Sequence, residues 1–354
     1  MKTSRGICAV ALGIACVLAL PCGAQQASKP TSGQKFTFKY ESKRPLAYSM
    51  GMKISMDMDM KVGTENMNMK MIVDMRYRVT LTPTADPKEG ITTMRLEPSN
   101  IEGDWDITSP GGHMVISLRG SDMKGTQNGV VVIDTAKDIG AAQAQELKKE
   151  ILPLYLSGQV DLDTRGNIKQ FRGDIPFVEF WTDALASQEG FFGIIFPERA
   201  IAVGDTWQES LSLKKMGQVK LEGDGLRCTV TFTRQPNVVV QGRSLSVFNL
   251  SAPFAHKNLT GSMEQMGQIT RLNISKFDRR ATGTYRFDPE KGVLTDGTMK
   301  ADANASMNAL VQGQALTMGL QMEMDMRVNL LSEKTESAQP RTAPVQTPAA
   351  NVQR

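Results

Sequence analysis

The strongest constraint on the fold is a strict two-residue alternation between Leu46 and Val62. Every even position of these 17 residues is apolar, and every odd position is polar or small. Successive side chains of a strand point to opposite faces, so the pattern predicts one long strand with a single buried face. After "GTEN" (63–66) the apolar residues move to the odd positions and continue to Leu81. The two runs together predict a long antiparallel hairpin.

The C-terminal region repeats this design. Residues 293–311 and 316–330 alternate in the same way and flank the turn residues 312–314. At ~3.3 Å per residue, a strand of this length reaches roughly 55 Å, and strands that long bend or twist strongly. Two shorter segments, 160–173 and 285–299, each read as strand, Asp- and Gly-containing turn, strand. Their similarity indicates a duplicated architecture.

Two segments have helical character. Residues 138–152 are rich in Ala, Leu, Glu and Lys and stop before Pro153, while residues 176–192 begin with Pro176 and carry an aromatic stripe. We therefore predict an α+β fold, mainly antiparallel β, built from two similar, strongly curved sheets of the half-barrel type. A few helices are expected to pack on the apolar sheet faces. The predicted halves are 36–175 and 176–331.

Both ends of the chain differ in composition from this body. Residues 1–24 have the basic start, the apolar run and the small residue Ala24 of a cleaved signal peptide, which predicts a periplasmic or secreted protein. Cys22 follows Pro21, whereas a lipid-acceptor Cys follows a small residue, so ordinary cleavage is favoured. Residues 25–35 are predicted to be a linker. Residues 332–354, rich in Pro, Thr, Ala and Gln, are predicted to be a disordered tail.

Cysteine usage and net charge restrict the classes of partner that the chain is expected to have. Cleavage after Ala24 would leave Cys228 alone, so the mature protein is expected not to depend on disulfides, with Cys228 a buried apolar residue. Removal of Lys2 and Arg5 reduces Lys+Arg from 41 to 39, against 37 acidic residues. The nearly neutral chain has no basic stripe for nucleic acid. No later segment resembles a membrane span, so it is not predicted to be an integral membrane protein.

Methionine dominates the predicted buried faces, supplying nine of the 26 residues from 50 to 75. Met is flexible and polarizable, so a surface that is rich in Met can adapt to different apolar partners. We expect the strands to place twelve of them as the hydrophobic lining of a ligand-binding cavity: Met50, Met52, Met56, Met58, Met60, Met67, Met69, Met71, Met318, Met322, Met324 and Met326.

Three interpretations of these methionines compete. The first is an exported, non-catalytic protein that binds or carries an apolar ligand, such as a lipid, an acyl chain or an apolar peptide. The second is an envelope structural or assembly protein with a dry Met-rich core and an envelope protein partner. The third is a Cu(I)-binding periplasmic protein, since thioethers suit soft metals. The Met stripes continue with Leu46, Ile54 and Val62 on the same face, which favours lining or core over metal.

A resemblance to a family arises at "FPERAIAVGDTWQESLSL" (196–213). The stretch from Gly204 to Trp207 resembles one found in a family of uncharacterised exported bacterial proteins. The resemblance covers most of 36–331 and implies an architecture similar to bacterial lipoprotein carriers, a curved antiparallel sheet whose concave apolar face is lined by helices. It implies no activity. By their residue types, Gly204 and Asp205 are expected to form a turn, and Trp207 to begin a strand and pack in the core.

Nothing in the chain predicts catalysis. His113 and His256 lie in predicted loops, and neither has a nucleophile or a metal-ligand spacing around it. The acidic side chains that alternate with methionine, such as Asp57 and Asp59, are expected to face water. We therefore predict no catalytic residues, no metal and no cofactor.

Overall fold

The computed structural model describes residues 33–40, 45–84, 87–151, 157–172, 193–213, 215–216, 219–223, 225–265, 268–311 and 314–331. The predicted signal peptide, the tail 332–354, the helix 176–192 and most of the linker lie outside the described residues.

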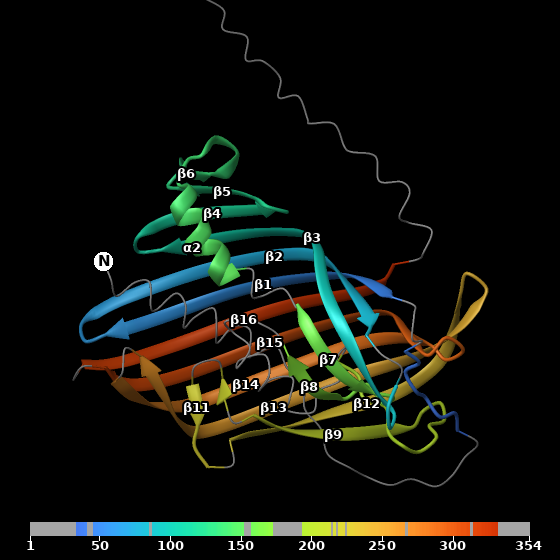
Figure 1. Ribbon diagram of the computed structural model, residues 1–354. Helices are drawn as coiled ribbons and strands as arrows, with labels where there is room; N and C mark the ends of the chain where they lie inside the picture. Colours follow the sequence, from blue (N-terminus) through green and yellow to red (C-terminus); the bar gives the residue numbers. More distant parts are fainter. Residues whose placement is uncertain are drawn as a thin grey trace, which may run out of the picture.

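The described strands form one continuous antiparallel sheet, curved and unclosed, and not the two sheets expected (Figure 1). The strand near the N-terminus pairs along almost its whole length with the last strand, which joins the two predicted halves edge to edge. The central strands, in their spatial order, are β13 (Arg243–Gln265), β14 (Gln268–Asp288), β15 (Val293–Val311), β16 (Gln314–Leu330), β1 (Leu46–Val62), β2 (Glu65–Pro83) and β3 (Ile91–Ser109).

Each border strand of this central sheet pairs with two separate branches. The first part of β3 pairs with β7 (Gly158–Asp163), which pairs with β8 (Ile168–Arg172). Its last part begins the branch β4 (Gly112–Arg119), β5 (Asp122–Gln127) and β6 (Val130–Asp134). On the other border, β13 pairs with β12 (Leu226–Val240), which pairs with β9 (Thr206–Leu213), and separately with β11 (Val219–Leu221), which pairs with β10 (Lys215–Met216).

Local patterns correctly predicted several elements. The turn at Gly63 has the positive φ of 58° that glycine adopts readily and joins β1 to β2. The two similar hairpins appear as β7–β8 and β14–β15. The first predicted helix is α2 (Ala141–Ile151), preceded by the 3-10 turn η1 (Thr135–Lys137). No helix in the described part of the chain has the length and apolar character needed to span a membrane.

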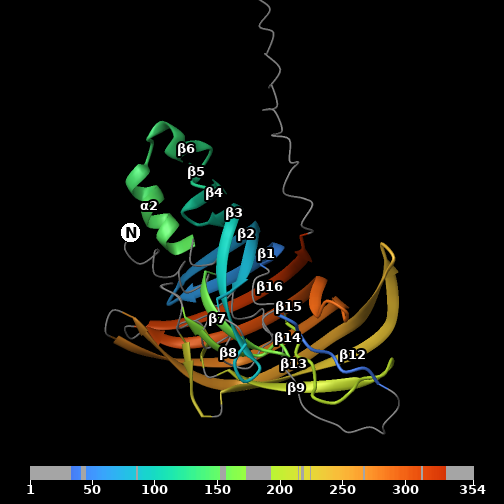
Figure 2. The same cartoon turned by 45° about the vertical axis from the view of Figure 1, so that its right-hand side comes forward.

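The alternation separates two faces of the sheet. Figure 2 shows how strongly the central strands curve. We call the face that carries the buried Met side chains of β1 the inner face. The opposite face exposes Asp57 and Asp59 as predicted, and Lys70 lies 3.2 Å from Asp57 there. Exposed ion pairs of this kind contribute little to stability, so burial of the inner face carries most of the free energy of folding.

Aromatic rings fill one end of the inner face. The extended segment 33–40 brings Phe36 and Phe38 against rings from three other parts of the chain. Phe36 lies 5.1 Å from Phe248, Phe38 lies 5.2 Å from Phe287, and Phe196 lies 4.9 Å from Phe287, measured between ring centroids. We call this the aromatic end, and the opposite end, near Met60, the Met end.

Three expectations about single residues can be compared with the described strands. The predicted loops around His113 and His256 are strands, since His113 is the second residue of β4 and His256 lies within β13. Their neighbouring Gly and Pro residues suggested loops, but the cross-strand pairing continues through both sites. Cys228 is buried as expected.

Candidate functional site

The two Met-rich segments of the sequence lie side by side on the inner face. Met56 of β1 is opposite Met322 of β16 on one side and Met71 of β2 on the other. Ile54 is opposite Met324, and Met58 is opposite Met69. Directly opposite residues have Cβ atoms about 5 Å apart, so these side chains touch across the strands. The pairing brings all twelve predicted lining residues onto three neighbouring strands.

Burial divides these twelve residues into two groups. Eight are buried: Met56, Met58, Met60, Met69, Met71, Met318, Met322 and Met324. Met50, Met52, Met67 and Met326 are partly buried. Met50 and Met52 lie between Tyr48 and Ile54, which are 0% and 3% exposed, so solvent reaches the inner face between two well-covered regions. Met326 is directly opposite Met52 and extends this accessible patch onto β16.

A fourth strand, β15, completes the Met-rich surface, and its contribution was not predicted. Met307 extends the row of Met67, Met60 and Met318, so that four methionines follow one another across β2, β1, β16 and β15. A second row of four consists of Met75, Met52, Met326 and Met299. Between these rows β15 carries alanines. The alternation of 293–311 indicated this face, and the predicted turn at 312–314 indicated the neighbouring strand, but Met299 and Met307 were not named as lining residues.

The small residues of β15 separate the methionines from a polar position on β14. Ala303 is opposite Met322 on one side and Arg279 on the other. Arg279 is 5% exposed and is engaged within the chain. His256 lies one strand further, on β13, diagonal to Arg279 and half-buried. A guanidinium so buried must have its charge compensated, because removing it from water is costly.

Trp105 adds a hydrogen-bond donor to the inner face. It lies on β3 opposite Val73 and is 2% exposed. Its indole Nε1 has no hydrogen-bond partner in the part of the chain that the structure describes. A buried N–H without an acceptor costs free energy, and an acceptor supplied by a ligand would recover it.

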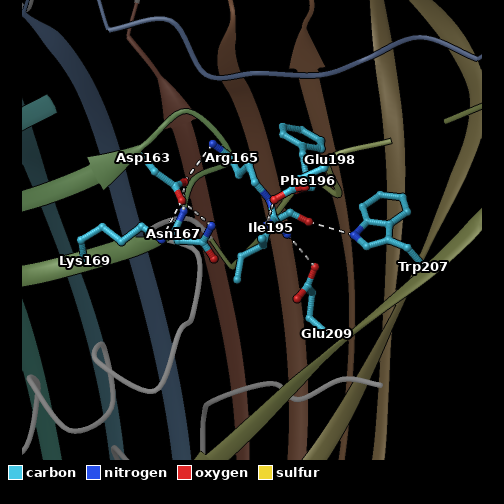
Figure 3. A network of polar contacts seen from close by, with 9 residues as sticks. All are labelled: Asp163, Arg165, Asn167, Lys169, Ile195, Phe196, Glu198, Trp207 and Glu209. Carbon is cyan, nitrogen blue, oxygen red and sulfur yellow. Dashed lines mark hydrogen bonds and ion pairs between the residues drawn. The ribbon is translucent and has the colours of Figure 1, made fainter. Parts of the chain in front are cut away.

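A polar network closes the aromatic end (Figure 3). Arg165, in the β7–β8 turn, donates from Nε to the carbonyl of Phe196 at 2.6 Å and from Nη2 to Glu209 of β9 at 3.2 Å. Glu198 lies 3.4 Å from Arg165 Nη1. These contacts link the branch that leaves β3 to the branch that leaves β13. Both views show the other two branches, β4–β6 and β10–β11, apart from each other (Figures 1 and 2).

Asp163 holds the turn that presents Arg165. Its Oδ1 accepts the backbone N–H groups of Arg165 and Asn167, both at 2.9 Å, and Lys169 lies 3.0 Å from its Oδ2. Burial alone would raise the pKa of Asp163, but the hydrogen bonds from Lys169 and Asn167 outweigh it and lower the pKa below 3.8. The pKa of Glu209 is shifted the other way, since burial raises it more than Arg165 lowers it.

The Gly204–Trp207 stretch has the structural role predicted for its residues. Gly204 has a φ of 88°, and Asp205 Oδ2 accepts the backbone N–H of Ala202 at 3.0 Å. This bond, followed by the interaction with Arg199, lowers the pKa of Asp205. Trp207 is buried, and its Nε1 donates to the carbonyl of Ile195 at 2.8 Å. The motif therefore anchors the segment 193–201 beneath the aromatic end.

The described residues contain no group of three or more His, Cys, Asp or Glu side chains that could hold a metal ion. His113 contacts a single acidic residue, with its Nε2 2.7 Å from Asp106 Oδ1, in an exposed cross-strand pair.

Comparisons with known proteins give distant likenesses. No protein-family model and no curated protein matches the chain, so the family resemblance at Gly204–Trp207 stays a prediction. Among solved structures, one of lipovitellin that concerns its lipid–protein interactions has 8% identity to this chain and a TM-score of 0.39. The match covers 87% of this chain and 27% of the lipovitellin chain. The chain thus spans about a quarter of lipovitellin.

Two bacterial structures are similar at a lower level. The translocator domain of the autotransporter NalP from Neisseria meningitidis has 8% identity and a TM-score of 0.16, covering 80% of this chain and 90% of that domain. OccK7 of Pseudomonas aeruginosa has 7% identity and a TM-score of 0.19, covering 81% and 99%. All three scores are low, so none of these likenesses assigns a function to the chain.

Proposed function

We propose that the protein is an exported, non-catalytic carrier that binds an apolar ligand against the Met-rich inner face. The observation that carries this proposal is the accessible patch of Met50, Met52 and Met326 on an apolar surface whose other methionines are mostly buried. Solvent-accessible methionines on a concave apolar face cost free energy unless something covers them, and an apolar ligand would do so.

The physical character of the side chains supports a carrier over a dry core. Unbranched Met side chains adapt to the shape of a bound chain, whereas a rigid core is better specified by Leu, Ile and Val. Under this proposal the bound molecule replaces water at the patch and packs along the Met rows of β1 and β16.

The direct test is mass spectrometry of organic extracts from the natively purified protein, together with titration of a fluorescent fatty-acid probe. We expect an apolar molecule to co-purify and the probe to bind. Met52→Gln should weaken probe binding about tenfold, since it places an amide in the apolar patch. The adjacent Lys53→Gln, on the outer face, should leave binding unchanged. Absence of any co-purified apolar molecule, together with no probe binding, would remove the proposal.

A second candidate function is favoured by the two rows of four methionines. Thioethers bind Cu(I), and neighbouring strands about 4.8 Å apart place successive sulfurs within reach of one ion. Competition with a colorimetric Cu(I) chelator tests this function. Copper withdrawal that is lost in the combined variant Met60→Leu, Met318→Leu would establish it, and no withdrawal by the natural chain would exclude it.

A further inference from the structure

The outer face of the sheet, opposite the Met side chains of β1, has a hollow over Gly319 of β16. Its volume is about 440 Å³, and residues of β2, β1, β16, β15 and β14 line it. Ligand sites in proteins occupy about 300–1,000 Å³, so the hollow is large enough to hold a ligand. Five neighbouring strands at a spacing of about 4.8 Å span roughly 19 Å. A molecule that follows the hollow therefore lies across the strands.

Neither the backbone nor the packing of β16 requires glycine at position 319. Gly319 pairs in regular register with Asp59 of β1 and Ser306 of β15, and it is not among the glycines with a positive φ. A Cβ at this position would meet nothing within 4 Å. Glycine in the interior of a strand weakens the strand, and it often marks a place where a ligand approaches the backbone closely. The missing side chain keeps the hollow open.

Gly51 of β1 is a matched case on the same face. A Cβ at Gly51 would also meet nothing within 4 Å, but Gly51 does not line the hollow. It is directly opposite Arg327 on one side and Arg76 on the other, and these long side chains can use the space above it. Gly319 has only short side chains opposite it, so the space above Gly319 is available to a ligand.

The side chains around Gly319 can both donate and accept hydrogen bonds. In the described part of the chain, the Asp59 carboxylate and the side-chain amides of Asn68, Asn304 and Gln321 have no hydrogen-bond partner within the protein. An amide donates and accepts, and a carboxylate accepts. Hydroxyl groups also do both, so a ligand that is rich in hydroxyl groups matches this lining.

The charges in the hollow balance one another. Asp57 and Asp59 line it together with Lys70 and Lys276. The Nζ of Lys70 lies 3.2 Å from Asp57, and the Nζ of Lys276 lies 2.7 Å from Asp278 at the border of the hollow. Charges of both signs at such close range leave no strong field that would attract an anion or a cation. The lining therefore favours a neutral ligand.

A second hollow, of about 460 Å³, adjoins the first along β14 and β15. Ser306 lines the first hollow, and Asn308, the next outward residue of β15, lines the second. Asn308 is opposite Asn273 of β14, which is opposite Thr260 of β13, so polar groups continue across three strands. Leu310 is 65% exposed and adds an apolar contact. A ligand that fills both hollows is elongated and carries repeated polar groups.

We infer that the outer face binds a neutral oligosaccharide or polysaccharide, whose chain lies across the strands over Gly319. Sugar units present many hydroxyl groups and have small apolar C–H faces, which match the amides of the lining and the exposed Leu310. The strand spacing of about 4.8 Å is close to the length of one sugar unit in an extended chain, so successive units can meet successive strands. This site lies on the opposite face from the Met-rich surface and does not rest on the proposed carrier function.

A protein partner fits these hollows less well. None of the described residues that line either hollow is aromatic. Protein interfaces are enriched in aromatic side chains and depleted of Lys, Asp and Ser, which are the residue types that line the first hollow. The observations therefore favour a saccharide.

The test is isothermal titration calorimetry with cellohexaose and chitohexaose, which are both neutral, extended chains. We expect the natural protein to bind at least one of them. The fully deacetylated counterpart of chitohexaose has the same backbone but is positively charged. It should bind about tenfold more weakly than the tighter neutral chain, because the lining has balanced charges.

Two pairs of variants locate the site. Gly319→Gln fills the floor of the hollow and should weaken binding about tenfold or more, whereas Gly51→Gln makes the same change outside the hollow and should leave binding unchanged. Asn304→Ala removes one amide from the lining and keeps the inference testable if Gly319→Gln does not fold. It should weaken binding about threefold to tenfold. Its control is Asn329→Ala, on the outer face of β16 and outside both hollows.

Several results would overturn the inference: binding of neither neutral hexasaccharide, binding that both Gly319→Gln and Asn304→Ala leave unchanged, or tighter binding of the charged chain. Self-association of the natural protein that Gly319→Gln abolishes, without saccharide binding, would assign the hollow to a second copy of the chain and overturn the inference as well. The fatty-acid probe reports the inner face separately, so failure of this inference is distinguishable from failure of the carrier function.

Discussion

Met56 of β1 lies directly opposite Met322 of β16, and this pairing joins the two ends of the chain in one sheet. The two side chains are 1% and 2% exposed. Because β1 has β2 on one edge and β16 on the other, the N-terminal hairpin has no free edge in the central sheet. The Met-rich surface therefore exists only when the first and last long strands have paired.

Substitution of this pair should reveal their coupling. Met56→Ala alone is expected to reduce the free energy of unfolding by about 2–5 kcal/mol, since it leaves a cavity at a buried position. Met322→Ala should cost a similar amount, and the double variant should deviate from additivity by about 0.5 kcal/mol or more because the residues touch. Urea denaturation measures all three. The losses in the free energy of unfolding from Met56→Ala and Leu226→Ala should be additive, because the strands β13 to β16 lie between the two sites.

The closure of the aromatic end depends more on Arg165 than on Glu209. Arg165→Met should lower the free energy of unfolding by about 2–3 kcal/mol, because it leaves the carbonyl of Phe196 and the half-buried Glu209 without their donor. Glu209→Gln should cost less than about 1 kcal/mol, since burial already raises the pKa of Glu209 and disfavours its charge. Denaturant titration at neutral pH compares the two. A larger loss in Glu209→Gln would contradict this ranking.

Asp163 should make the protein sensitive to acid. Its folded-state pKa is lowered below 3.8, so its contribution to stability is present above that pH and is lost as the pH falls through the folded value. Glu209 works in the opposite direction, because its raised pKa gives a contribution that is present below 4.5 and decreases as the pH rises through the folded value.

The variant Asp163→Asn separates these effects. The difference in urea midpoint between the natural chain and Asp163→Asn should be largest at neutral pH and should shrink as the pH falls below about 3.8. Asp57→Asn is the control, since Asp57 is exposed on the outer face and its ion pair with Lys70 contributes little. A difference for Asp163→Asn that does not change with pH would show that its role is steric.

Trp105 and Trp207 are both buried, but they should respond differently to replacement by Phe. Trp207→Phe removes a donor and leaves the carbonyl of Ile195 unsatisfied, which adds about 1–3 kcal/mol to the cost of the smaller ring. Trp105→Phe removes an indole N–H that has no acceptor in the described chain, so it should cost less. Thermal unfolding of the ligand-free variants tests the order. Equal losses would indicate that Trp105 Nε1 is satisfied in solution.

Local sequence patterns predicted the strands of this fold more successfully than their arrangement. The alternation from Leu46 to Val62 correctly gave the bounds and the buried face of β1, because the two-residue period is a property of one strand. The pairing of β1 with β16 was not predicted. Two long hairpins with similar patterns can form two separate sheets or one continuous sheet. Which of these forms depends on whether their edge strands, which are far apart in sequence, pair with each other.

The candidate site shows the same division. All twelve predicted methionines lie on one face of three adjacent strands, because alternation fixes the face. Arg279 was missed because the bulge before Lys276 changes the parity of β14, so that Arg279 rather than Arg280 turns inward. Neither residue type nor spacing distinguishes these two arginines. Such an irregularity becomes visible once the partner strand β15 is in place.

Two glycines of adjacent strands should respond in opposite ways to alanine. A Cβ at Gly297 of β15 would lie 2.6 Å from Cδ1 of Tyr285, whose buried ring covers the glycine, and 3.1 Å from Val328. Gly297→Ala should therefore reduce the free energy of unfolding by about 1–3 kcal/mol through overpacking. A Cβ at Gly319 of β16 would meet nothing within 4 Å, so Gly319→Ala should be neutral or stabilise the strand by up to about 1 kcal/mol.

Urea denaturation measures the free energy of unfolding of the two glycine variants. The comparison sets the inner face of the sheet against the outer face, with a similar change in backbone entropy at both sites. Because both residues lie within paired strands, the entropic gain from replacing glycine is similar at both sites, and the difference between the variants reports the contact with Tyr285. Combining Gly297→Ala with Tyr285→Leu should recover part of the lost stability. The leucine side chain is smaller and more flexible than the tyrosine ring, so it can move away from the new methyl group. If Gly297→Ala is as stable as Gly319→Ala, Tyr285 does not lie flat over β15, and the aromatic end is packed differently from the arrangement described above.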